Sequence, residues 1–428
     1  MSRLLGTVLA AALVAVAATS AARAGEPEWI RQFGSDTYDG DVGVAVGPDG
    51  RVHVLGGTRG AVATHEGFND IYVITFDRDG RELWRLQRGA RESDYAEGIA
   101  TDADGNLYVT GATYGSLGGI YKGYHDGFVL TFDNQGRDGW KRHPATYEAD
   151  YPTCVATDPD GSVYVAGFTS GSLGGSQKGG EDAFIIKYDR DGRILRRRQP
   201  GTTSSDNARG IATDAEGNVY VVGNTQGALG GAYKGGDRWP YGDAFVIKYD
   251  RDGRILWKRQ PGTNEADHAF GVATDSDGNV FVVGTTYGAL AGPYKGGGES
   301  YGDAFVIKFD ADGRIVWKRQ RGTPGSDVAS GVATDADGNA YVVGGTEGEF
   351  GGLHQGNTDA FVLKFDRDGT LVWSDQPGTP SSDWASGVAT DTDGNAYVAG
   401  STFGSLPDNT NLGESDAFLI KYGPGGPR

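Results

Sequence analysis

Cysteine is almost absent from this sequence: among 428 residues there is one, Cys154, and there is also only one methionine. A single cysteine excludes an intrachain disulfide, so the folded state must be stabilised by packing and hydrogen bonds. Basic residues are outnumbered, with 39 Lys and Arg against 57 Asp and Glu and a formal net charge of -18. This acidic balance argues against binding to nucleic acid or to anionic lipid through bulk charge.

Long apolar runs are also missing, except at the beginning of the chain. Residues 1–24 combine a basic Arg3, an apolar stretch from Leu4 and a small-residue ending at Ala24. This is the pattern of a secretory signal peptide, and its apolar stretch is too short to span a bilayer easily. We therefore expect cleavage after residue 24, export to the periplasm or to the cell surface and medium, and no membrane insertion after cleavage. Residues 25–428 are expected to form one domain and to be monomeric.

Motifs of catalysis and metal binding are not evident. The six histidines are scattered and lack ligand spacing, and neither a nucleophile elbow nor a phosphate loop is present. We therefore expect a binding protein rather than an enzyme, without a cofactor.

What the sequence has instead is a repeat. Tryptophans recur along the sequence at intervals of 55 to 61 residues, and Arg196 occupies the one position of this series that lacks tryptophan. The series is Trp29, Trp84, Trp140, Arg196, Trp257, Trp317 and Trp373. A period of this length indicates a solenoid, an array or a propeller.

Each unit contains four short apolar runs bounded by Gly, Asp or Asn, as in "GVATD", "VFVVGTT", "DAFVIKFD" and "RIVWKRQ" from Gly271 onward. Runs of this length and composition predict β-strands. Seven units of four antiparallel strands predict an all-β, seven-bladed β-propeller. The seventh unit ends at "DAFLIKYGPGGPR" without its tryptophan strand, whereas "EPEWIRQFG" near residue 29 supplies one. The N-terminal strand is therefore expected to pair with the C-terminal blade and close the ring.

Units of the form "GVATDxDGNxYVVGxT … DAFVIKYDxDG … W" closely resemble the bacterial seven-bladed β-propeller repeat called SBBP. The resemblance covers essentially all of the chain after residue 24. It implies the propeller fold and an exported or cell-surface location, and it implies no particular activity.

The run "TDADGN" at residues 101–106 and 334–339 has two interpretations. Asp-Gly between apolar runs favours a hairpin turn, because glycine accepts the positive φ that such turns need. The alternative is a calcium loop, but the further ligands and the bidentate Glu of an EF-hand do not follow. We favour the turn and keep calcium as the alternative.

Two sets of aspartates recur in all seven units and are expected on the face that carries the long loops, which we call the top face. Sevenfold repetition favours a structural role in which each carboxylate accepts loop N–H bonds; an acidic rim is the alternative. The first set stands four residues before each expected inner strand: Asp39, Asp94, Asp150, Asp206, Asp267, Asp327 and Asp383. The second set opens each third strand: Asp70, Asp126, Asp182, Asp243, Asp303, Asp359 and Asp416.

Departures from the repeat are the candidate binding residues, because a site for one ligand must break the sevenfold symmetry. Exposed aromatic groups beside carboxylates suit sugar or peptide binding, and the candidates are Tyr95, Tyr151, Trp239, His268, Tyr301 and Trp384. We expect a secreted, non-catalytic propeller that binds a protein or glycan on its top face. The alternatives are a hydrolase or lyase that uses top-face carboxylates with a divalent cation, and a structural component of the envelope or cell surface.

Overall fold

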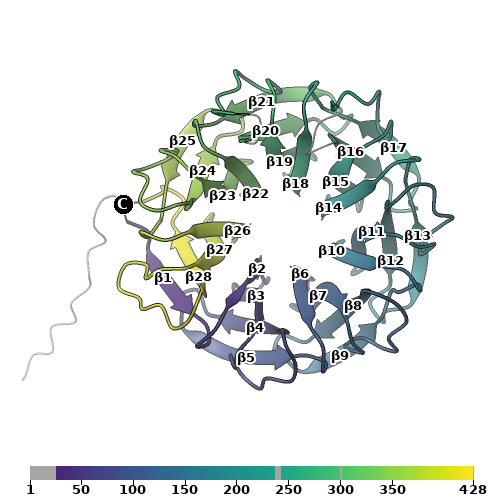
Figure 1. Cartoon of the computed structure of the whole chain (residues 1–428), viewed down its shortest axis with the longest axis horizontal. Helices are drawn as coiled ribbons and strands as arrows, with labels where there is room; N and C mark the ends of the chain where they lie inside the picture. The colour runs from purple at the N-terminus through teal and green to yellow at the C-terminus, as the bar shows by residue number, and fades with distance from the viewer. Residues whose placement is uncertain (1–25, 237–241, 299–300, 428) are drawn as a thin grey trace, which may run out of the picture.

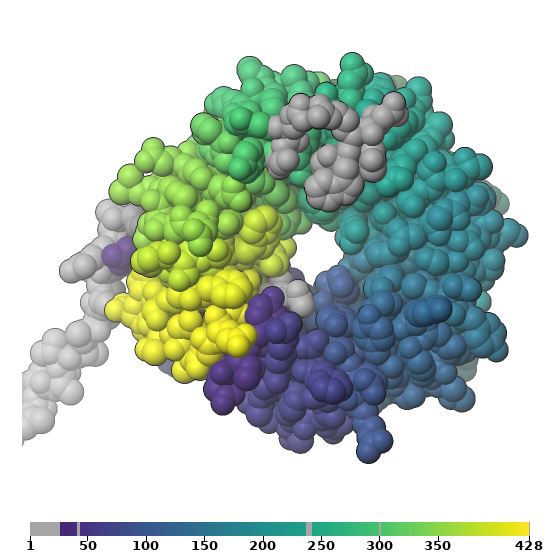
Figure 2. Space-filling view, viewed as in Figure 1, coloured from purple at the N-terminus to yellow at the C-terminus, as the bar shows by residue number. Residues whose placement is uncertain are grey.

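The computed structural model describes residues 26–427 apart from 237–241 and 299–300, and the regular structure of these residues consists of β-strands. The strands form seven four-stranded antiparallel sheets, which are arranged as blades around a central channel (Figures 1 and 2). The seven-bladed propeller expected from the sequence is confirmed. No helix within the described residues is long and apolar enough to cross a membrane.

The first two strands of each blade occupy equivalent places in every repeat. The strands that line the channel are β2 (Asp39–Val46), β6 (Asp94–Thr101), β10 (Asp150–Thr157), β14 (Asp206–Thr213), β18 (Asp267–Thr274), β22 (Asp327–Thr334) and β26 (Asp383–Thr390). The second strands are β3 (Val52–Thr58), β7 (Leu107–Thr113), β11 (Val163–Thr169), β15 (Val219–Thr225), β19 (Val280–Thr286), β23 (Ala340–Thr346) and β27 (Ala396–Thr402).

The last two strands lie toward the outside of the ring. The third strands are β4 (Asp70–Phe76), β8 (Asp126–Phe132), β12 (Asp182–Tyr188), β16 (Asp243–Tyr249), β20 (Asp303–Phe309), β24 (Asp359–Phe365) and β28 (Asp416–Tyr422). The outer strands are β5 (Glu82–Arg88), β9 (Asp138–Arg142), β13 (Ile194–Arg198), β17 (Ile255–Arg259), β21 (Ile315–Arg321), β25 (Leu371–Asp375) and β1 (Trp29–Phe33). Blades 1 to 6 begin at β2, β6, β10, β14, β18 and β22, and blade 7 combines β26–β28 with β1.

The ring is closed by the two ends of the described chain. Strand β1 pairs antiparallel with β28, from Trp29 opposite Lys421 to Phe33 opposite Ala417. Figure 1 shows the purple β1 beside the yellow β28. This pairing confirms the expected closure, and it covers an edge of β28 that would otherwise present unpaired backbone groups.

The hydrophobic core lies between the blades. Strands such as β19 and β20 are buried along their whole length, as expected for strands that are covered on both faces. One cluster joins Phe281 and Val306 of blade 5 to Phe361 and Phe365 of blade 6. Because the same residue types recur in each repeat, equivalent clusters form between successive blades around the ring.

The inner strands begin earlier than the sequence predicted. The first set of aspartates was expected four residues before these strands, but each aspartate is the first residue of its strand. The reason is a register shift near the start of the strand, for example between Ala269 and Gly271 in β18. An extra residue at such a bulge interrupts the alternation of side chains, so the sequence pattern becomes regular only after the bulge.

Threonines at the ends of the inner strands connect neighbouring blades beside the channel. The Thr157 hydroxyl donates to the Thr101 carbonyl at 2.7 Å, and the Thr213 hydroxyl donates to the Thr157 carbonyl at the same distance. The pattern continues through Thr274, Thr334 and Thr390. It begins at blade 1, where Thr101 donates to the carbonyl of Val46.

The repeated tryptophan fastens each outer strand to the next blade. In β21, the Trp317 indole N–H donates to the Arg367 carbonyl at 2.9 Å, and the indole lies against Gly369 of the following hairpin. The Arg319 guanidinium is 5.4 Å from the Trp317 ring centroid, and its Nε donates to the Gly369 carbonyl at 2.7 Å. This clamp explains why tryptophan recurs at this position in six of the seven units.

Candidate ligand-binding site

The first set of aspartates is buried, with each residue at most 1% exposed. In blade 6, Asp327 Oδ2 accepts the backbone N–H of Thr323 at 2.6 Å, and its Oδ1 accepts the hydroxyl of Thr346. Burial raises the pKa of Asp327 to about 6, although these hydrogen bonds lower it. The carboxylate therefore fixes the chain as it passes from one blade to the next.

The second set is buried equally well and, in six of the seven blades, is held by a glutamine in or directly after the outer strand. In blade 3, Gln199 donates to Asp182 Oδ2 at 3.0 Å, accepts from the N–H of Gly174 at 2.9 Å and donates to the Gly171 carbonyl. A Cβ at Gly201 would lie 2.2 Å from Asp182 Oδ1, so only glycine fits there. Asp182 Oδ2 is thus hydrogen-bonded to a protein donor, and the carboxylates of this set lie below the surface.

Blade 2 departs from this arrangement. His143 stands where the other blades have glutamine, and its Nε2 lies 2.8 Å from Asp126 Oδ2. Ala145 stands where Gly201 stands in blade 3. At the boundary between blades 2 and 3, the residues that surround the second-set aspartate therefore differ from the glutamine and glycine of the repeat.

A row of aromatic rings crosses the top of the same boundary. The ring centroid of Tyr95 is 6.2 Å from that of Tyr114, which is 4.0 Å from that of His125. His125 is 4.6 Å from Tyr151, and Tyr151 stacks on Phe168 at 4.9 Å. We call these five residues the aromatic row. Because all five are half-buried or exposed, parts of the rings remain accessible beside the channel.

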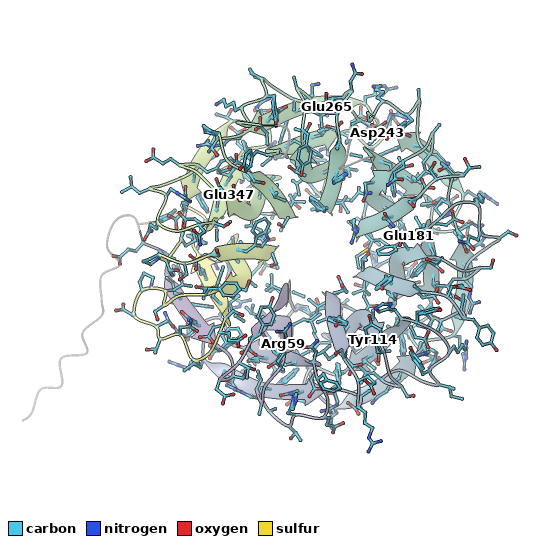
Figure 3. The ribbon with its side chains drawn as sticks, viewed as in Figure 1. Arg59, Tyr114, Glu181, Asp243, Glu265 and Glu347 are labelled. Atoms are coloured by element: carbon cyan, nitrogen blue, oxygen red, sulfur yellow. The ribbon has the colours of Figure 1, made fainter. Side chains whose placement is uncertain are left out.

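Charged and polar groups flank the row. The guanidinium carbon of Arg209, in blade 4, lies 5.0 Å from the Phe168 ring centroid. Glu181 accepts a 2.8 Å hydrogen bond from the side-chain amide of Asn207, and Glu97 is exposed on β6. Tyr114 in blade 2 and Glu181 in blade 3 mark this region in Figure 3. The site thus offers aromatic faces with hydrogen-bonding groups of both charges.

Burial shifts the pKa of two groups of the row, Tyr151 and His125. Burial, together with Tyr114 and Glu181 nearby, raises the pKa of Tyr151 to about 12. Burial also lowers the pKa of His125, although Asp126 opposes that shift. The 2.6 Å hydrogen bond between the Tyr151 hydroxyl and His125 Nδ1 therefore joins two neutral groups at pH 7. This neutral, hydrogen-bonded pair suits stacking and hydrogen bonding to a ligand.

The other predicted candidates lie elsewhere. Trp384 packs over Gly345 in blade 6 and donates to the Ser330 hydroxyl at 3.1 Å. The His268 ring is 6.4 Å from Tyr287 within blade 5, and Tyr301 is an exposed residue of the blade 5 loop. Trp239 lies outside the described residues. Among the candidates that the structure describes, only Tyr95 and Tyr151 come together, through Tyr114 and His125.

The sequence interpretation missed Tyr114, His125, Phe168 and Arg209. A signal for them exists, since each occupies a position that varies among the repeats near the top of a strand. At the Phe168 position, for example, the other blades have Gly57, Ala112, Asn224, Thr285, Gly345 and Ser401.

The Asp-Gly runs form turns at the opposite face. Asp102 Oδ1 accepts the backbone N–H groups of Asp104 at 3.0 Å and Asn106 at 2.9 Å, and Gly105 has a φ of 81°. The aspartate therefore binds its own turn, and the hairpin interpretation accounts for these contacts. Over the described parts of the chain, no group of three or more His, Cys, Asp or Glu residues is placed to hold a metal ion.

Two curated proteins are similar in sequence to part of this chain. The regulatory protein FlaEY of Caulobacter vibrioides is 29% identical over 281 residues, which cover 60% of this chain and 28% of that protein. An uncharacterized WD repeat-containing protein, L264, of Acanthamoeba polyphaga mimivirus is 22% identical, with coverage of 84% of this chain and 34% of that protein. The chain thus spans about a third or less of the length of these relatives.

A chain in the crystal structure of a mitotic checkpoint complex shares the fold, with a TM-score of 0.54 at 13% identity over 98% of this chain and 99% of that one. The sequence model described as the beta-propeller repeat SBBP matches five segments: residues 83–118, 197–231, 256–290, 316–351 and 372–407. Each match runs from an outer strand into the next blade, in agreement with the repeat in the structure. The chain is a β-propeller repeat protein, and five of its segments match the SBBP repeat.

Proposed function

We propose that this protein is a non-catalytic binding module that holds a protein or glycan ligand against the aromatic row of blades 2 and 3. The observation that carries the proposal is the row itself, in which five rings from two blades contact one another. The scaffold does not require these rings, because the blades that lack them have the same strands. Tyrosines that anchor a ligand often contribute about 2 kcal/mol or more each.

The test uses variants that other blades already tolerate. Tyr151→Asn copies Asn207 of blade 4, and Phe168→Ala copies Ala112 of blade 2. Each should weaken binding of a ligand, selected from an oligosaccharide array and a defined peptide library, by about tenfold or more, with an unchanged melting temperature. Val328→Asn, at the Tyr151 position of blade 6, is the matched control. Equal binding by all three variants would refute the proposed site.

The burial of the repeat aspartates supports binding over catalysis. The hydrolase or lyase alternative needs carboxylates that reach a substrate, whereas these carboxylates are buried and accept hydrogen bonds from backbone, threonine and glutamine donors, as Asp327 and Asp182 do. A bound ligand should therefore be recovered unchanged after prolonged incubation with the protein, as measured by mass spectrometry. Recovery of a cleaved product would favour the enzyme.

We also propose that the protein acts outside the cytoplasm. The signal-peptide pattern of residues 1–24 supports this location, although those residues lie outside the described part of the chain. The intact mass of the protein recovered from periplasm and medium tests the proposal. The expected mass is that of a chain beginning near residue 25, and a cytoplasmic protein that retains residues 1–24 would contradict it.

A further inference from the structure

Four large apolar side chains are strongly exposed on loops beside the aromatic row. They are Phe68, Ile120, Tyr124 and Tyr147, and their exposed fractions are 70%, 84%, 72% and 81%. We call them the outer apolar patch. Side chains of this size and exposure present on the order of 400 Å² of surface, which is comparable to the largest apolar patch of a typical monomer.

Backbone contacts hold the loops of the patch together. A Cβ at Gly67, beside Phe68, would lie 2.2 Å from the Ala90 carbonyl oxygen, and one at Gly115 would lie 2.6 Å from Ala90 Cβ. A Cβ at Gly123 would lie 2.6 Å from the Tyr147 carbonyl oxygen. The loops that carry Phe68 and Tyr124 are therefore packed onto the two chain passages that join blades 1, 2 and 3, and Tyr147 lies on the second of these passages.

The patch is continuous with the aromatic row. The Tyr121 hydroxyl donates to the Tyr124 carbonyl at 2.9 Å. Tyr124 directly precedes His125 of the row, whose ring centroid is 4.0 Å from that of Tyr114. Tyr114 belongs to the row, so one surface extends from the channel to the outer edge of blade 2.

The fold does not need these apolar groups. In blade 3, the equivalents of Ile120, Tyr124 and Tyr147 are Ser176, Gly180 and Thr203. Loops of the same length and geometry therefore form without them. Since exposure of large apolar groups to water is unfavourable, their concentration around blade 2 and its two boundaries points to a partner that covers them.

The chemistry of the patch favours a protein over a glycan. Ile120 and Phe68 offer apolar area without hydrogen-bonding groups, which suits apolar side chains of a partner. Exposed Glu66, Glu92 and Glu148 lie next to the patch in the sequence, against exposed Arg91 and Lys122, and the chain as a whole has a net charge of -18. A basic partner is therefore attracted, and an acidic one is repelled.

We propose that the outer apolar patch binds a protein segment in which apolar side chains are flanked by lysine or arginine. This inference rests on the proposed function, since the same ligand would extend from the aromatic row onto the patch. The inference specifies the chemical class of the partner. It also specifies the path of the bound segment, which runs from the channel to the outer edge of blade 2.

The experiment compares two synthetic peptides that share the same tryptophan and leucine residues and differ in flanking lysines or glutamates. One protein variant combines Ile120→Ser, Tyr124→Gly and Tyr147→Thr, which introduce the equivalent residues of blade 3. The control variant is Leu353→Ser. Leu353 occupies the Ile120 position in blade 6 and is 75% exposed. Binding is measured by titration calorimetry at low and high salt, and sedimentation of the protein alone is measured in parallel.

The basic peptide should bind at least about tenfold more tightly than the acidic one, and added salt should weaken it. The triple variant should lose about tenfold or more in affinity, whereas Leu353→Ser should bind normally. Equal binding of both peptides, no effect of the triple variant, or self-association that the triple variant abolishes would each overturn the inference. So would an oligosaccharide whose binding depends on the patch.

The two proposals can fail separately. If Tyr151→Asn weakens a ligand that the triple variant binds normally, the aromatic row stands and the inference about the patch is wrong. If the triple variant weakens the basic peptide and Tyr151→Asn and Phe168→Ala do not, the patch stands and the proposed site on the row is wrong.

Discussion

Replacement of Arg196 by tryptophan should stabilise the propeller. Arg196 takes the place of the tryptophan clamp in blade 3, and beside it is a cavity of about 20 Å³ lined by groups that include Tyr164, Tyr249 and Gly253. Filling such a cavity contributes about 0.5 kcal/mol at about 24 cal/mol per Å³. An indole hydrogen bond to the Arg251 carbonyl, like that of Trp317 to its hairpin, would add about 1 kcal/mol.

The total of about 1.5 kcal/mol corresponds to a small change in melting temperature. For a folded chain of about 400 residues, an unfolding entropy of about 2 cal/mol/K per residue converts this stabilisation to about 2 °C. Differential scanning calorimetry at fixed pH and scan rate can resolve such a shift. The reverse substitution, Trp257→Arg in blade 4, should lower the melting temperature by a similar amount.

Arg197→Trp is the matched control, because successive residues of a strand point to opposite faces. An indole at position 197 adds the same apolar group without entering the space between blades 3 and 4. If Arg196→Trp leaves the melting temperature unchanged, or if Arg197→Trp raises it equally, the assignment of the repeated tryptophan as an interblade clamp is wrong.

Three further predictions concern closure, pH and metal. Deletion of Glu26–Gly34 removes β1 and should cause aggregation or a clear loss of stability in size-exclusion and melting experiments; an equally stable monomer would contradict the closure. Burial raises the pKa of Asp94, Asp267 and Asp327 to about 6, above their ordinary 3.8, so these groups stabilise the folded state below about pH 4 and lose that contribution as the pH rises through 6. The melting temperature should therefore increase from pH 7 to pH 5, and a decrease would refute this reasoning. Addition of EDTA should change the melting temperature little, because the turn aspartates bind their own backbone; a loss of more than about 10 °C would indicate a saturated metal site.

The fold could be predicted well from the sequence because each repeat contains the same pattern of strands and turns. Turn residues and buried strands recur in every unit, so an irregular place such as Arg196 does not hide the period. The start of the inner strands was wrong because a bulge interrupts side-chain alternation, as between Ala269 and Gly271. A pattern based on alternation cannot find the residues before such a bulge.

The site was predictable only in part. Tyr95 and Tyr151 were found because they share one position of the repeat, and that position varies. His125 and Phe168 come from other positions, and they join the row through contacts across a blade boundary. Such contacts depend on the rotation from one blade to the next, which local sequence spacing does not contain.

The threonine hydrogen bonds beside the channel have a mechanical consequence. Each hydroxyl donates to the preceding blade, but blade 1 has Val46 at this position, so blade 1 has no hydroxyl to donate to Thr390 of blade 7. On the top face the same boundary is fastened by Ser415, whose hydroxyl donates to the Asp39 carbonyl at 2.8 Å. The ring is therefore less stiff across this boundary at one end of the channel than at the other. Under heat or tension, blades 1 and 7 should separate first at the Val46 end of their boundary, while the contact between Ser415 and Asp39 still holds them together on the top face.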